Sequence, residues 1–208
     1  MIARLLAPIR RKGGVANLGR IAWQTARQRA FSAIYARWLR WRGVRVGSGC
    51  RFRGRIVVHG DPRRVTIGPG SSLHPGVTFW THDYGAGLGA IVLGRNVTCL
   101  QGVTFNSMAK IEVGDDSAFG AHCYVQDNDH GTDPGTPVMR QPSRARPIAI
   151  GRDVWLGARC VVLEGVAIGD RAIVGAGSVV TRSLPGDMVA VGVPCRAIKP
   201  RTALPRVA

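Results

Sequence analysis

Large aliphatic side chains recur every six residues between residues 148 and 181. The positions are Ile150, Leu156, Val162, Ile168, Val174 and Val180. A period of six matches neither the 3.6-residue period of an amphipathic helix nor the two-residue period of a single extended strand. It is typical of short strands separated by regular turns, which let each aliphatic side chain point into one shared core.

Small residues keep the same phase as the aliphatic ones. Glycine suits corners where a Cβ atom would clash, and it follows the aliphatic position at Gly151, Gly157, Gly169 and Gly175. A small or β-branched residue stands four positions after the aliphatic one, at Val154, Cys160, Val166, Ala172 and Ser178. The phase extends back to Val44, with loops predicted at residues 80–90 and 127–147. The pattern therefore predicts an all-β chain of stacked coils.

This repeat resembles the hexapeptide repeat of the left-handed parallel β-helix acyltransferases, over roughly residues 44–200. The resemblance implies such a helix over residues 44–184, after an N-terminal extension at residues 1–43. Residues 185–208 are expected to form a C-terminal cap and tail, because an uncapped last coil exposes unpaired strand edges. The left hand comes from the resemblance alone, since most crossovers between parallel strands are right-handed.

The N-terminal extension is basic and is predicted to contain an amphipathic helix at residues 17–42. The chain carries a net charge of +17, of which residues 1–64 supply +15, with sixteen Lys and Arg against Asp61. The large apolar positions with helical spacing include Trp23, Ile34, Trp38 and Trp41. Two interpretations stay open: the helix of residues 1–42 lies on an anionic membrane, or it packs on the β-helix or a neighbouring subunit. Residues 1–42 are expected to be dispensable for chemistry.

The sequence also limits where in the cell the protein is expected to be. No run of about eighteen apolar residues is present, and Arg4 and Pro8 interrupt any signal-peptide core. We therefore expect a cytoplasmic protein that can also lie at the inner face of the membrane. The cysteines form no CxxC pair and are predicted to be reduced core residues; they are Cys50, Cys99, Cys123, Cys160 and Cys195. No nucleic-acid-binding motif accompanies the positive charge, so no nucleic-acid partner is expected.

Few side chains can act as a base near neutral pH. The five histidines lack metal-ligand spacing, and the chain has no GxSxG motif, which leaves general-base catalysis by one imidazole. In sugar and xenobiotic O-acetyltransferases of the resembled family, the catalytic histidine lies in a loop about one coil before a VWIG segment. Here Val154–Gly157 is that segment, so the resemblance assigns the base role to His130. Asp127 and Asp129 either orient this imidazole or stabilise turns, and His82 and Asn106 are expected to contact the acceptor.

The resemblance also implies acetyl-CoA as co-substrate, bound between the subunits of a homotrimer, and no metal. The matching positions are Trp155, Ala158, Ala176, Thr181, Arg182 and Lys199. Ala158 and Ala176 can offer backbone N–H groups to the pantetheine or to an oxyanion. Arg182 and Lys199 suit the phosphates.

The predicted function is acetyl transfer from acetyl-CoA to a sugar hydroxyl, in the biosynthesis of a surface polysaccharide or glycolipid. One alternative is a non-catalytic β-helix scaffold. The other is a zinc enzyme similar to the γ-class carbonic anhydrases, which needs three histidines meeting at an interface. The spacing of the histidines in this chain does not offer that set.

Overall fold

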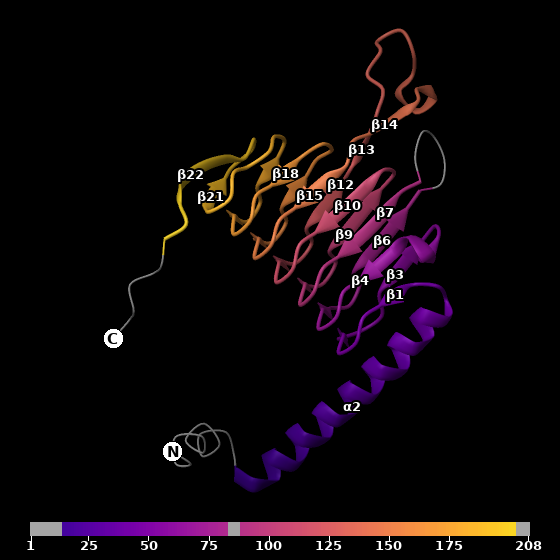
Figure 1. Ribbon diagram of the computed structural model, residues 1–208, viewed down its shortest axis with the longest axis vertical. Coiled ribbons are helices and arrows are strands. Elements are labelled where there is room, and N and C mark those ends of the chain that lie inside the picture. The colour runs from indigo at the N-terminus through magenta and orange to yellow at the C-terminus, as the bar shows by residue number, and fades with distance from the viewer. Residues whose placement is uncertain (1–13, 83–87, 203–208) are drawn as a thin grey trace.

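The computed structural model describes residues 14–82 and 88–202. Helix α2 (Gly14–Trp41) leads into a stack of coils built from short strands (Figure 1). Three parts of the predictions lie outside the described residues: the basic segment 1–13, residues 83–87 of the first loop, and the tail 203–208.

Each coil contributes one strand to each of three parallel sheets. The first sheet contains β1 (Arg45–Val46), β4 (Val65–Ile67), β7 (Ala90–Leu93), β10 (Lys110–Val113), β15 (Ile148–Ile150) and β18 (Ala167–Ile168). The second contains β2 (Arg51–Phe52), β5 (Ser72–Leu73), β8 (Thr98–Cys99), β11 (Ala118–Phe119), β16 (Trp155–Leu156), β19 (Ile173–Val174), β21 (Met188–Val191) and β22 (Arg196–Pro200). The third contains β3 (Val57–His59), β6 (Thr78–Thr81), β9 (Thr104–Ser107), β12 (Tyr124–Gln126), β17 (Val161–Val162) and β20 (Val179–Val180). This is the predicted left-handed parallel β-helix.

The core of the stack is a column of side chains from successive coils. All six aliphatic positions and all five small positions of the repeat are buried, which confirms the predicted phase. In the earlier coils aromatic rings take these places: Phe79 stacks on Phe105 at 5.5 Å between ring centroids, and Phe105 meets Phe119 edge-on at 5.2 Å. The corner glycines stand where a Cβ atom would clash, as expected. A Cβ atom at Gly157 would lie 2.5 Å from the backbone nitrogen of Ala176 on the next coil.

The two predicted loops leave the stack at the same edge, where the third sheet passes to the first. We call it the loop edge. The second loop is more ordered than the sequence suggested, because β13 (Asn128–His130) pairs antiparallel with β14 (Ser143–Ala145). A short 3₁₀ turn, η2 (Val138–Arg140), follows in the hairpin's connection, and η1 (Pro62–Arg64) lies on the first coil. These short polar strands do not follow the period of six, so the repeat pattern indicated only a loop at residues 127–147.

Helix α2 covers the open strand edge of the first coil with side chains. The Ser32 hydroxyl donates to the Phe52 carbonyl at 3.3 Å and accepts from the Phe52 N–H at 3.1 Å. The Tyr35 hydroxyl does the same for Ile56, at 3.2 and 3.1 Å. Arg40 Nε donates to the Val46 carbonyl at 2.9 Å. These groups pair with backbone atoms that a preceding strand would otherwise occupy, and they confirm that the helix packs on the β-helix.

The prediction of an amphipathic helix was wrong. The capping side of α2 buries Leu39 together with the small residues Ser32 and Ala36, whereas Trp23, Ile34 and Trp41 are exposed on the other side. Apolar side chains therefore occur on both sides. Removing residues 1–42 would uncover the first coil, so their expected dispensability for chemistry does not extend to folding. Within the described ranges, no helix is long and apolar enough to cross a membrane.

The C-terminal end is closed as predicted, up to residue 202. Strand β21 pairs with β19, and β22 returns antiparallel along β21. The backbone N–H of Cys195 donates to the Val179 carbonyl at 2.8 Å, which covers the third sheet. All five cysteines are buried and free, which confirms their predicted core role. Burial raises the pKa of the Cys99 thiol, so it is a poor nucleophile.

Candidate active site

A chain of polar contacts links three coils at the loop edge. Asn106 on β9 donates from Nδ2 to the Tyr124 hydroxyl at 2.9 Å, which turns its Oδ1 toward His82. His82 Nε2 lies 2.7 Å from that oxygen. The ring of Trp80 stacks on His82 with centroids 5.3 Å apart. The structure thus brings together the two residues predicted to contact the acceptor. Tyr124 and Trp80 were not predicted, because they occupy ordinary outward positions of their strands.

His130 is exposed and lies at the end of β13, in the hairpin above this network. Asn128, two residues earlier, donates from Nδ2 to the Asn106 carbonyl at 3.3 Å. Because alternate residues of a strand point to the same face, the His130 imidazole projects from the hairpin face that carries Asn128. That face is joined to Asn106.

The carboxylate of Asp127 is buried and fixes the turn of the preceding coil. Its Oδ2 accepts from the Ser107 hydroxyl at 2.7 Å and from the Ala109 N–H at 3.0 Å. Its Oδ1 accepts from the Met108 N–H at 2.7 Å. Both oxygens are therefore engaged by backbone and hydroxyl donors. Of the two interpretations left open for Asp127, these contacts are those of turn stabilisation.

Asp129 also contacts backbone. Its Oδ1 accepts from the N–H of His130 at 2.8 Å, and its side chain is exposed. This bond stabilises the strand end and involves the backbone of His130, not its imidazole. Among the described residues, neither aspartate forms a hydrogen bond or ion pair with the imidazole ring.

A buried glutamate ties the hairpin to the coil below it. Glu164 Oε1 pairs with Arg144 Nε at 3.0 Å and with Arg146 Nη2 at 3.1 Å. Arg144 belongs to β14 and stands opposite Asp129 in the ladder. Glu164 therefore helps to set the position of His130. Nothing in the repeat pattern indicates this role, because the equivalent positions in neighbouring hexads hold surface residues such as Arg152.

The positions expected to bind acetyl-CoA lie on two edges of the stack. Ala158 and Ala176 follow second-sheet strands, at an edge that we call the alanine edge, and the Gly177 N–H donates to the Ala158 carbonyl at 2.8 Å. The exposed Trp155 is on the adjoining strand β16. Thr181 and Arg182, both exposed, follow β20 and thus lie at the loop edge.

The width of the third sheet separates these two edges within one chain, since β17 and β20 run from the alanine edge to the loop edge. Lys199 lies at neither of these two edges; it is on β22, at the end of the second sheet. The structure therefore groups Trp155, Ala158 and Ala176, but it does not bring them to His130, Thr181 and Arg182 within one copy.

The described residues contain no group of three or more His, Cys, Asp or Glu side chains placed to hold a metal ion.

Comparison with known proteins identifies the family. Residues 147–182 match the model of the hexapeptide repeat of succinyl-transferase. The galactoside O-acetyltransferase of Escherichia coli K12 is 33% identical over 167 residues, which cover 72% of this chain and 78% of that protein. The chain belongs to the hexapeptide-repeat acyltransferases. A second relative of this acyltransferase is the putative lipopolysaccharide biosynthesis O-acetyl transferase WbbJ of E. coli K12, 32% identical over 121 residues, 54% of this chain and 62% of that protein.

A solved structure agrees with this assignment. The maltose O-acetyltransferase of Clostridium difficile 630 has a TM-score of 0.56 and 28% identity, covering 79% of this chain and 73% of that chain. The acyltransferase spans between half and about three quarters of the length of the curated relatives it matches.

Proposed function

We propose that this acyltransferase moves an acetyl group from acetyl-CoA to a hydroxyl group of a sugar, with His130 as general base. The observation that carries the proposal is the link from Asn128 to Asn106, because it holds the His130 hairpin beside the network of His82 and Asn106. A sugar hydroxyl bound by these polar groups would meet the imidazole. The relatives named for galactoside and maltose support an O-acetyl transfer.

The reaction would be a direct transfer. His130 takes the proton of the acceptor hydroxyl while the oxygen attacks the thioester carbonyl, and the C–S bond then breaks. The imidazolium returns the proton to the CoA thiolate, so the protons balance. Backbone N–H groups beside Ala158 would stabilise the oxyanion.

This mechanism needs a second copy of the chain. The alanine edge and the loop edge are separated by the third sheet, so Ala158 of one subunit would face His130 of its neighbour. A homotrimer closes such heterologous contacts into a ring with one site at each interface. CoA would then lie in the groove between two subunits.

The acceptor class follows from the relatives and from exposure. The His130 hairpin projects from the stack (Figure 1), so a large acceptor can approach it. The relative named for lipopolysaccharide biosynthesis supports a polysaccharide or glycolipid precursor. The test is acetyl-CoA turnover against nucleotide-, lipid- and oligosaccharide-linked sugars. We expect turnover with a lipid- or oligosaccharide-linked acceptor. Absence of acetyl transfer together with absence of CoA binding would instead support the non-catalytic scaffold.

Arg182→Ala and Lys199→Ala should each weaken CoA binding several-fold at low salt. Both side chains are exposed, and a cation in partial contact with solvent contributes less to phosphate binding as ionic strength rises. The loss should therefore shrink at 0.5 M salt, because the Debye length there is well below the roughly 8 Å of 0.15 M salt. Calorimetric titration with CoA measures this. Arg95→Ala, which removes an arginine paired with Asp115, is the control. Unchanged affinity in both test variants would remove these residues from the site.

We further propose that α2 rests on the anionic inner face of the membrane. Its exposed aliphatic and aromatic residues form a stripe at helical spacing, comprising Trp23, Phe31, Ile34, Trp38 and Trp41. Arg42 lies over the Trp38 ring at 5.2 Å from its centroid. Tryptophan and arginine together suit a lipid headgroup region. Trp23, Ile34 and Trp41 lie on the side of the helix opposite Ser32 and Ala36, whereas Phe31 and Trp38 flank these three residues and stack on Tyr35.

Replacing Trp23, Ile34 and Trp41 by Gln should abolish most co-sedimentation with phosphatidylglycerol vesicles. The three side chains make none of the capping hydrogen bonds, so the first coil should stay covered. Wild-type protein should sediment with anionic vesicles and less with phosphatidylcholine. A different result would contradict the membrane proposal. If the wild type sediments with neither kind of vesicle, and the triple variant differs from it in molecular mass in solution, the stripe contacts another copy of the chain instead.

A further inference from the structure

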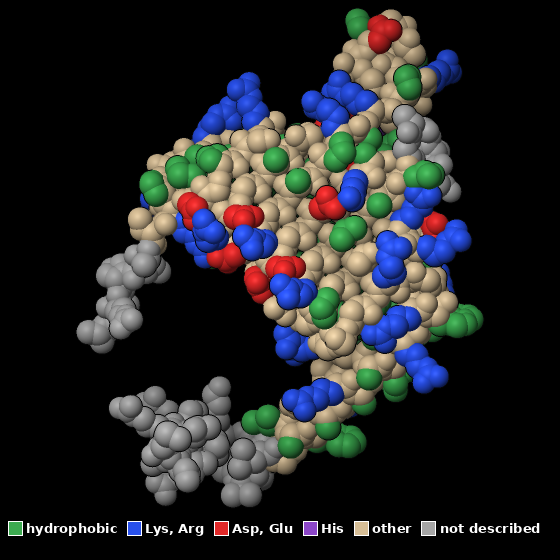
Figure 2. All heavy atoms as spheres, viewed as in Figure 1, with side chains coloured by type: hydrophobic (Ala, Val, Ile, Leu, Met, Phe, Trp, Pro, Cys, Tyr) green, Lys and Arg blue, Asp and Glu red, His purple; other side chains and the backbone are tan. Residues whose placement is uncertain are grey.

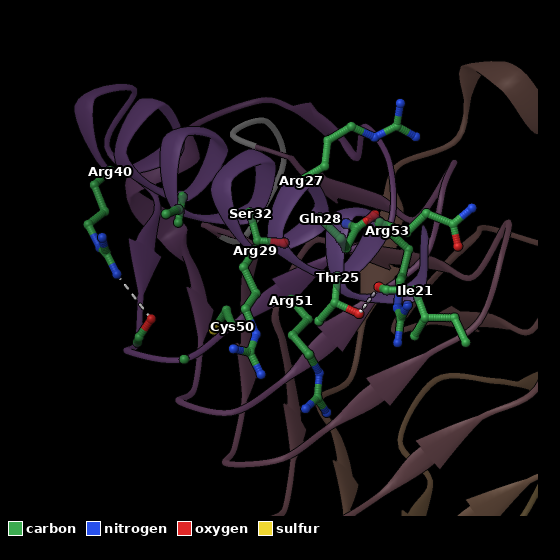
Figure 3. A pocket seen from close by; sticks show the side chains of 15 residues that line it. Ile21, Thr25, Arg27, Gln28, Arg29, Ser32, Arg40, Cys50, Arg51 and Arg53 are labelled. Atoms are coloured by element: carbon green, nitrogen blue, oxygen red, sulfur yellow. Dashed lines mark hydrogen bonds between the residues drawn. The ribbon is translucent and has the colours of Figure 1, made fainter. Parts of the chain in front are cut away.

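A groove of about 910 Å³ lies between α2 and the beginning of the second sheet. Polar and small residues of the helix form one wall, and the turn before β2 and the start of β2 form the other (Figure 3). Its lining holds five arginines, which are Arg27, Arg29, Arg40, Arg51 and Arg53. No acidic side chain is among the described residues that line it.

The capping contacts fix the groove's two walls against each other. Gln28 and Ser32 of α2 both hydrogen-bond to the backbone of Phe52. Arg29 lies between these two anchored residues in the sequence, so its backbone is held beside the first coil.

Arg51 and Arg53 stand on either side of the fully buried Phe52. Because side chains alternate along a strand, both point outward while the phenylalanine points into the core. Figure 3 shows Arg29, Arg51 and Arg53 extending to the same side of the groove, whereas Arg27 points away from it. Arginines from α2 and from the β2 region therefore line the same groove, and the capping contacts hold these two elements together.

The charge of these arginines is not compensated by the chain. On later coils, arginines at the edge between the first and second sheets are paired with aspartates: Arg95 with Asp115 at 2.8 Å, Arg152 with Asp170 at 3.1 Å and Arg171 with Asp187 at 2.6 Å. In the space-filling view, acidic groups adjoin basic ones along these coils, whereas the basic groups on α2 have no acidic neighbours (Figure 2).

Within the described part of the chain, Arg29, Arg51 and Arg53 make no ion pair. The N-terminal segment cannot supply one, because Asp61 is the single acid among residues 1–64. That carboxylate is already shared by Arg63 and Arg64.

Arginine forks match phosphoryl oxygens in geometry and charge, and guanidinium groups held together without a counter-charge repel one another. An anion that bridges them relieves this repulsion. The volume exceeds that needed for a single phosphate and falls in the range of about 300–1,000 Å³ usual for small-molecule sites. We propose that this groove binds a phosphoryl anion of diphosphate size, held by Arg29, Arg51 and Arg53.

The groove lies on the first coil, whereas Ala158, Ala176 and His130 belong to later coils, so this inference does not rest on the proposed acetyl transfer. The phosphoryl anion has two possible sources with the same chemistry: a soluble diphosphate, or the headgroups of an anionic lipid. The groove and the aromatic stripe of α2 lie on different sides of the helix, so the variants for one leave the other intact.

The test is calorimetric titration of the CoA-free protein with inorganic pyrophosphate, since CoA carries a diphosphate of its own and would compete for the groove. The double variant Arg29→Gln/Arg51→Gln should lose at least tenfold in affinity. The matched control is Arg37→Gln/Arg55→Gln, which removes the same charge from the same end of the molecule but not from the groove. It should stay within about threefold of the wild type, because distant exposed charges are screened.

Vesicle binding separates the sources. If Arg29→Gln/Arg51→Gln also loses phosphatidylglycerol vesicles, and pyrophosphate displaces them from the wild type, the groove takes lipid headgroups. Groove-dependent pyrophosphate binding with unchanged vesicle binding assigns a soluble diphosphate. No saturable binding by the wild type, or an equal loss in the control variant, would overturn the proposal, and acetyl transfer would be unaffected.

Discussion

His130→Ala should lower acetyl transfer by a factor on the order of 10² or more and leave CoA binding nearly unchanged. Removing a general base costs about 10²- to 10⁴-fold in rate, and His130 belongs to the hairpin that Asn128 joins to Asn106, not to the alanine edge. The rate is measured with the best acceptor of the sugar panel, and CoA affinity by calorimetry. A fall in kcat without a change in CoA affinity would be the signature of lost chemistry.

Variants of two other histidines, His74 and His82, serve as controls for this experiment. His74→Ala removes a half-buried imidazole of the second coil that is outside the proposed site, and it should keep activity within a few-fold. His82→Ala should weaken acceptor binding, because His82 holds Asn106. If His130→Ala keeps activity within a few-fold while His82→Ala abolishes it, the base is His82.

Asp127→Ala should destabilise the fold by about 3–5 kcal/mol, since it leaves the N–H groups of Met108 and Ala109 without their acceptor and removes one of the two partners of the Ser107 hydroxyl. For a chain of this length that corresponds to a fall in Tm of roughly 10 °C. Thermal unfolding at fixed protein concentration measures it, since an oligomer's Tm depends on concentration.

Asp129→Ala is the matched control, because that carboxylate is exposed and accepts from its own neighbour. Its effect should stay within about 0.5 kcal/mol. The pair also tests the two interpretations of the aspartates. An unchanged Tm for Asp127→Ala, together with a large loss of rate, would show that Asp127 acts on the imidazole instead of on the turn.

The stacked part of this molecule could be predicted because each hexad repeats the same local rule. An aliphatic residue such as Leu156 and a small one such as Cys160 are buried by the same geometry in every coil, so a period in sequence becomes a column in space. The family resemblance then located His130 in its loop. Neither step needs any contact between distant residues to be known.

The parts that the sequence did not reveal depend on such contacts. Asp127 meets Ser107 across twenty residues, and Glu164 holds Arg144 across a similar span, with no shared phase to connect them. The wrong assignment of α2 as amphipathic has the same origin. Its capping side works through the hydroxyls of Ser32 and Tyr35, which a hydrophobicity pattern counts as ordinary polar positions.

The hydroxyls of Ser32 and Tyr35 have a consequence for how this protein avoids fibres. Parallel coils stacked about 4.8 Å apart have the spacing of cross-β fibrils, and a bare terminal coil offers N–H and C=O groups to the next chain as a template for elongation. On the first coil, both groups of Phe52 and both groups of Ile56 are already bonded to side chains of a helix. A helix cannot itself be extended by a strand, so growth stops there and copies of the chain are left to associate through their flanks.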